Sequence, residues 1–80
     1  MIMKEKKPCI VVTFHTTAEA MATERTCTKN GIEGKLISAP RVLSADCGIA
    51  WKSPPGARSL IEEALKAEKI EYAGIYELEI

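Results

Sequence analysis

Cys47 is the side chain of this sequence with the clearest capacity for chemistry. It opens an apolar run, is followed by Gly48 and is preceded by a polar loop that contains Ser44 and Asp46. A thiolate can carry sulfur, attack a disulfide or bind a metal. Gly48 would leave room for a close approach and let a backbone amide face an anion. The competing interpretation is a small core residue, because free cysteine is among the most buried residue types.

Five other residues are candidates for a site around Cys47. His15 is the only histidine, so it could act as a general base or as the partner of a thiolate. Thr16 and Thr17 open a helix, where they would serve as caps or help to bind an anion. Arg41 could hold an anionic substrate, and Ser44 more often shapes a turn. Each of them has an ordinary structural alternative.

The other two cysteines, Cys9 and Cys27, are expected to be core thiols. Three cysteines do not suit a disulfide framework, so we expect free thiols in a reducing compartment. No Cys-x-x-Cys pair occurs, and one thiol with one histidine offers too few ligands for a metal without a dimer. We therefore expect no metal site and no cofactor.

Length and charge limit the class of protein. The chain has 80 residues, enough for one small domain, which we place at residues 8–80 behind a flexible segment at 1–7. Its 11 basic and 11 acidic residues argue against nucleic-acid binding, which needs a basic face. No apolar run reaches the ~20 residues of a membrane span, and no secretion signal is evident. We expect a cytoplasmic protein.

The periodicity of the chain predicts six elements. Short β-branched or alternating runs indicate strands at residues 8–14, 34–39, 47–52 and 70–80, the last with Tyr72, Tyr76 and Leu78 on one face. A helix is predicted over residues 16–30, with Thr16 and Glu19 as a capping box and with Ala18, Met21, Ala22 and Cys27 facing inward. A second helix follows Ser53, its expected cap, with an apolar stripe over residues 57–68.

This order, β-α-β-β-α-β, predicts an α+β domain of the ferredoxin-like split βαβ type. Four strands would form one antiparallel sheet, with both helices on one face and with the first and third strands as central neighbours. The end of the first strand then lies beside the start of the third. This arrangement predicts that His15 and the start of the first helix lie next to Cys47, with Arg41 on the same edge. An aromatic side chain on the face away from the helices would mark a surface for a homodimer.

Several stretches resemble a known family. They are Val12 to Thr17, Cys27 with Asn30-Gly31-Ile32, Leu36-Ile37, Pro40-Arg41, Ser44 to Trp51, and Ile75-Tyr76-Glu77. Together they resemble the Se/S carrier protein-like family of small prokaryotic proteins, over nearly the whole chain from Ile10 to Leu78. The Phe-His stretch and the Ser-x-x-Cys-Gly-x-Ala stretch are its most specific parts.

The resemblance implies a sulfur or selenium carrier that holds its cargo on Cys47 as a persulfide or selenosulfide. It also implies partners such as a cysteine desulfurase or a selenium-metabolism protein. We therefore expect a carrier rather than an independent enzyme. The alternative is a non-catalytic module that binds a small ligand or a partner protein at the edge of His15, Arg41 and Gly48, with structural cysteines.

Overall fold

The computed structural model describes residues 7–43 and 47–79. The flexible segment expected at residues 1–7 lies outside this range except for Lys7, and Ser44 and Asp46 also lie outside it. The elements are strands β1 (Pro8–Thr13), β2 (Lys35–Ser38), β3 (Ile49–Ser53) and β4 (Gly74–Glu79), helices α1 (Thr17–Lys29) and α2 (Arg58–Ala67), and a short 3-10 helix η1 (Pro55–Ala57) before α2.

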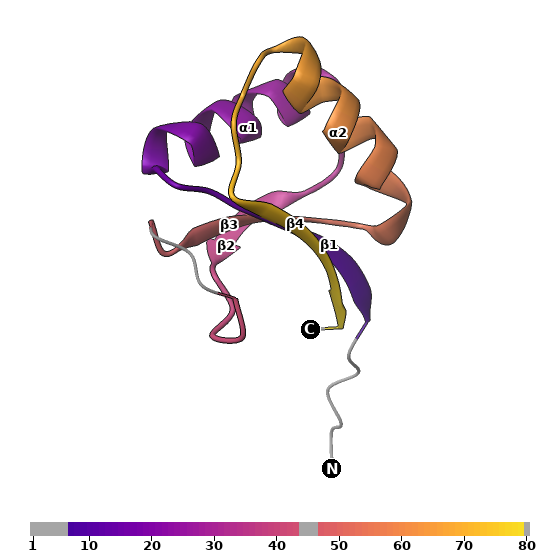
Figure 1. Cartoon of the computed structure of the whole chain (residues 1–80). Coiled ribbons are helices and arrows are strands. Elements are labelled where there is room, and N and C mark those ends of the chain that lie inside the picture. The colour runs from indigo at the N-terminus through magenta and orange to yellow at the C-terminus, as the bar shows by residue number, and fades with distance from the viewer. Residues whose placement is uncertain (1–6, 44–46, 80) are drawn as a thin grey trace.

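The predicted ferredoxin-like arrangement is confirmed. The four strands form one antiparallel sheet in the order β2-β3-β1-β4, so β1 and β3 are the central neighbours. Both helices cover one face, and the segment that follows β2, residues 39–43, extends below the other (Figure 1). The β1–β3 ladder pairs Ile10 with Ser53 and Thr13 with Ala50. The end of β1 therefore lies beside the start of β3, as predicted.

Helix α1 begins and ends as predicted, but its inward face is different. Thr16 caps it, the capping box with Glu19 is complete, and Gly31 follows the last turn with a positive φ of 70°. The buried residues of α1 are Ala20, Thr23 and Cys27, whereas Met21 is 52% exposed. The Thr23 hydroxyl donates to the carbonyl oxygen of Glu19 at 2.9 Å, which lets a polar side chain face the core.

Strand β3 begins later than predicted, and its last residue, Ser53, has a different role from the predicted one. It starts at Ile49 rather than Cys47, and Ser53 is a buried strand residue instead of a helix cap. The Ser53 hydroxyl accepts a hydrogen bond from the Trp51 indole at 2.7 Å and donates to the carbonyl oxygen of Glu33 at 2.7 Å. These two hydrogen bonds hold the segment before β2 against β3. Helix α2 starts only after η1.

Strand β4 is also shorter than predicted. It starts at Gly74, and the preceding segment is a connection in which the Ala73 amide donates to the Thr13 carbonyl oxygen at 2.7 Å. Tyr72 packs against the helix-side core, while Tyr76 pairs with Val11 on the face away from the helices. The two tyrosines therefore do not share a face. Tyr76 is 39% exposed there.

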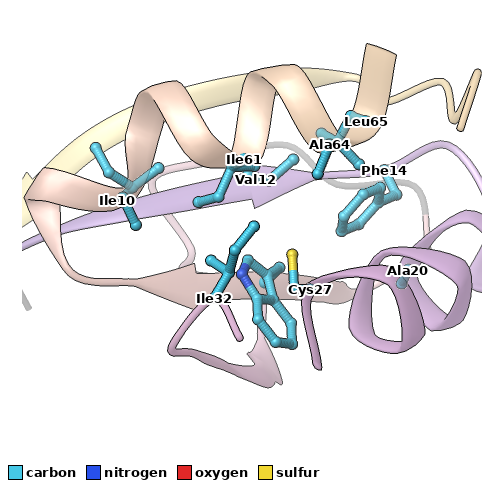
Figure 2. Close-up of a cluster of buried hydrophobic side chains, with 11 residues drawn as sticks. Ile10, Val12, Phe14, Ala20, Cys27, Ile32, Ile61, Ala64 and Leu65 are labelled. Atoms are coloured by element: carbon cyan, nitrogen blue, oxygen red, sulfur yellow. The ribbon is translucent and has the colours of Figure 1, made fainter. Parts of the chain in front are cut away.

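The main core fills the layer between the helices and the sheet. Ile10, Val12 and Phe14 from β1 and its end meet Ile61 and Leu65 from α2 (Figure 2). Alternate residues of the strands point to the other face, where Cys9, Val11 and Ala50 form a second, smaller cluster. Part of the β2–β3 loop packs against this second cluster, so the loop reaches beneath the sheet.

Candidate functional site

Cys47 lies in the turn immediately before β3. Its side chain is half-buried against the main core, and its thiol donates to the carbonyl oxygen of Ile49 at 3.3 Å. A thiolate has no proton to donate, so this hydrogen bond exists only in the thiol form. Cys47 is thus a loop residue held against a core, and not the first residue of a strand.

The turn around Cys47 depends on Gly48. Gly48 has a φ of 74°, a left-handed conformation that glycine adopts without strain. Its carbonyl oxygen accepts a hydrogen bond from the Ala39 amide at 3.0 Å, which closes the β2–β3 loop at its base. No atom lies within 4 Å of a Cβ built at Gly48, so backbone conformation rather than space favours glycine.

His15 reaches the same edge of the sheet as Cys47. It follows the end of β1, two residues after Thr13, and Thr13 pairs with Ala50 near the start of β3. The imidazole is exposed, and its backbone amide donates to the Glu19 carboxylate at 2.9 Å. The sheet register therefore brings His15 and Cys47 to one edge of the domain.

The Glu19 carboxylate already places a negative charge at the start of α1. The Glu19 carboxylate accepts hydrogen bonds from the amides of His15 and Thr16, and the Thr16 hydroxyl accepts one from the Glu19 amide at 3.2 Å. Thr16 is therefore a cap, and Thr17 is the exposed first residue of the helix. The carboxylate offsets the positive end of the helix dipole, which weakens its attraction for a second anion.

No contact among the described residues places Arg41 or Ser44 beside Cys47. Arg41 is exposed in a turn between Pro40 and Leu43, and Leu43 packs on the sheet face away from the helices. Cys47 packs on the helix side instead. Arg41 makes no hydrogen bond or ion pair with the residues that the structure describes, and Ser44 lies outside them.

Cys9 and Cys27 are core thiols, as predicted. Their side chains are 4% and 0% exposed, respectively, and all three cysteines are free. The Cys27 sulfur lies inside the layer between α1 and the sheet (Figure 2). Burial raises the pKa of Cys27 from its ordinary 9.0 to about 11, because the thiolate would lose its hydration.

The raised pKa of Cys27 predicts a loss of stability at high pH. The unfolded chain loses this proton near pH 9.0, whereas the folded protein keeps it up to about pH 11. The contribution of the protonated Cys27 thiol to the free energy of unfolding is therefore fully present below about pH 9. It falls by up to about 2–3 kcal/mol as the pH rises toward 11. Urea unfolding at about pH 8 and about pH 10 measures the loss.

Cys27→Ala is the control for this pH dependence. It removes the buried thiol and keeps every other ionisable side chain of the protein. The unmodified protein should lose more stability than Cys27→Ala over this range. Parallel pH dependences of the two proteins would contradict the assignment.

Two further findings concern metals and membranes. Within residues 7–43 and 47–79, no group of three or more His, Cys, Asp or Glu side chains could hold a metal ion. Over the same ranges, no helix has the length and apolar character needed to cross a membrane.

The fold and the thiols together define a class: a small ferredoxin-like α+β domain with one partly exposed cysteine in the turn before a central strand and two buried cysteines. Comparison with protein families identifies the particular family. The family described as "Putative Se/S carrier protein-like" matches residues 9–77, nearly the whole chain, and the protein belongs to it. Neither the search of curated proteins nor the search of solved structures found a match.

Proposed function

We propose that this protein carries sulfur or selenium on Cys47. One observation carries the assignment to this residue: Cys47 is half-buried in a turn, while Cys9 and Cys27 are enclosed in the two cores. A carrier thiol must meet the reactive atom of a donor and then of an acceptor, so it must be reachable. Membership of the Se/S carrier protein-like family supports sulfur or selenium as the atom that is carried.

The proposed transfer needs no external oxidant. The Cys47 thiolate attacks the outer sulfur of a donor persulfide, R–S–SH, and a new Sγ–S bond forms as the donor's S–S bond breaks. The donor leaves as a thiolate, which takes up the proton that Cys47 released. Cys47 then holds –S–SH, and an acceptor thiol removes the outer sulfur by the same exchange. A selenosulfide would form analogously from an outer selenium atom.

His15 is the proposed partner of the ionised thiol or persulfide. It shares the edge of the sheet with Cys47, and a protonated imidazole favours a neighbouring anion. The helix dipole is a weaker candidate, because Glu19 already occupies the first turn of α1. Thr17 and Gly48 are exposed residues near this edge, and we assign them to binding rather than to proton transfer.

The donor and the acceptor are proposed to be other proteins. A cysteine desulfurase or a selenium-metabolism protein would deliver the atom, because the proposed chemistry on this chain is exchange at one thiol. Free thiols suit a reducing compartment, so we place this exchange in the cytoplasm.

Replacing Cys47 with serine should abolish sulfur loading. The protein is incubated with a low-molecular-weight persulfide, excess donor is removed, and the added sulfur is counted by intact-mass spectrometry. We expect one sulfur per chain before the substitution and less than about a tenth of that in Cys47→Ser, since a serine hydroxyl does not displace a thiolate from sulfur.

Cys9→Ser is the matched control, because it also removes one thiol but leaves Cys47 in place. It should load normally. Loading of Cys47→Ser at the normal stoichiometry would contradict the proposal, and the binding-module alternative with structural cysteines would then be favoured.

A further inference from the structure

A hollow of about 670 Å³ lies at the opposite end of the sheet from Cys47. It forms where β1 and β2 begin and β3 ends, and its lining includes Lys7, Glu33, Lys35 and Lys52. This volume is within the range of small-molecule sites, roughly 300–1,000 Å³. The hollow shares no lining residue with the proposed carrier site, so the two are different sites.

The charges around this hollow do not cancel. Three lysines face one glutamate, although the whole chain has equal numbers of basic and acidic residues. Lys35 lies directly opposite Lys52 in the β2–β3 ladder, so their side chains start from neighbouring positions on the same face of the sheet. Within the described residues, none of the three lysines forms an ion pair.

Two directly opposed lysines repel each other and so weaken the strand pairing at this position. Like charges on paired strand positions repel, and no carboxylate of the described chain is bonded to either lysine. A bound dianion would relieve this repulsion and gain two charge-assisted hydrogen bonds. The local charge therefore favours an anionic ligand, and a dianion could contact both lysines.

Three prolines give the hollow an apolar part of its wall, and hydrogen bonds of Ser53 hold one side in place. Pro8, Pro54 and Pro55 contribute rigid rings to its wall. Ser53 anchors one side through its hydrogen bonds to the Trp51 indole and the Glu33 carbonyl oxygen. A site that is fixed before binding loses less entropy when a ligand arrives. The proline rings favour a ligand with an apolar group beside its charge.

We propose that this hollow binds a small organic dianion of the phosphate-ester class, with the phosphate between Lys35 and Lys52, near Lys7, and the organic group against the prolines. This site is independent of the thiol chemistry proposed for Cys47. Lysine is a common phosphate partner in proteins, acting as a point charge.

Phenyl phosphate is the probe, because it joins a dianion to an apolar ring. It is titrated into the full-length protein at constant ionic strength, and amide shifts are followed by two-dimensional NMR. We expect saturable shifts centred on Gly34, Lys35, Lys52 and Ser53. Inorganic phosphate should bind the same residues more weakly, since it makes no contact with the prolines.

Lys35→Gln and Lys52→Gln separate a binding role from a structural one. Each should weaken phenyl phosphate binding by about fivefold or more, while Lys66→Gln, an exposed substitution on α2, should leave it unchanged. Neither pocket variant should unfold at a lower urea concentration than the unmodified protein, because each removes a like-charge contact.

Three results would overturn this proposal. The first is an absence of saturable shifts with phenyl phosphate, and the second is an equal loss of affinity in Lys66→Gln. The third is equal binding of inorganic phosphate, which would remove the role of the proline wall. Sulfur loading on Cys47 is measured separately, so failure of one proposal leaves the other testable.

Discussion

Replacing Gly34 with alanine should lower the free energy of unfolding by about 3 kcal/mol. An added Cβ would lie 2.5 Å from both the Lys52 carbonyl oxygen and the Trp51 ring, and 2.6 Å from the Ser53 hydroxyl. The Trp51 ring is 1% exposed and cannot swing aside, and the carbonyl belongs to β3. Overpacking of a rigid site costs about 1–3 kcal/mol. The loss is measured by urea denaturation.

Gly56→Ala is the matched control for this substitution. No atom lies within 4 Å of a Cβ at Gly56, so its free energy of unfolding should change by less than about 0.5 kcal/mol. Equal unfolding midpoints for the two variants would show that the segment before β2 does not approach β3 as closely as described. A small domain has about 0.05–0.15 kcal/mol of stability per residue, so the expected loss is a large share of the total.

Cys47 should react with iodoacetamide at neutral pH at least about 100-fold faster than Cys27. The pKa of Cys27 is raised from 9.0 to about 11, which alone lowers its thiolate population about 100-fold relative to an ordinary thiol. Its side chain is also 0% exposed, whereas that of Cys47 is half-buried in a turn. Peptide mapping by mass spectrometry gives the rate at each cysteine.

Unfolding provides the control for these rates. In concentrated urea the three cysteines should react within a few-fold of one another, since burial no longer separates them. Cys9, at 4% exposure, should follow Cys27 and react slowly in the folded protein. Similar rates for Cys27 and Cys47 in the folded protein would contradict the described burial of Cys27.

The topology could be predicted from the sequence because its local signals agree with one another. The Thr16–Glu19 capping box and the glycine after Asn30 mark the ends of α1, and both are present in the structure. Apolar β-branched runs mark the strands, and the handedness of crossovers leaves few ways to connect them. The predicted adjacency of β1 and β3 followed from this order alone.

The inward face of α1 could not be predicted from hydrophobicity. Thr23 is buried because its hydroxyl bonds within its own helix, while Met21 faces solvent. Similarly, the sequence predicts that Ser53 is a helix cap, because serine is frequent before the first turn of a helix. Its actual partners, Trp51 and Glu33, depend on tertiary contacts that no local pattern encodes.

The positions of His15 and Cys47 in the fold could be predicted from the sequence, whereas the path of the β2–β3 loop could not. The edge shared by His15 and Cys47 follows from the strand order, but the division of the β2–β3 loop between the two sheet faces does not. The lysine-lined hollow was missed, because the opposition of Lys35 and Lys52 depends on a cross-strand register that their spacing in the sequence does not reveal.

The most direct test of the proposed carrier is to locate the transferred atom in the unmodified protein. A limiting amount of persulfide donor is added, the product is trapped by alkylation, and each cysteine-containing peptide is analysed for an added sulfur. We expect the sulfur to be found on Cys47 and to be released when a thiol reductant is added. Sulfur on Cys9 or Cys27, or distributed equally among the three cysteines, would contradict it.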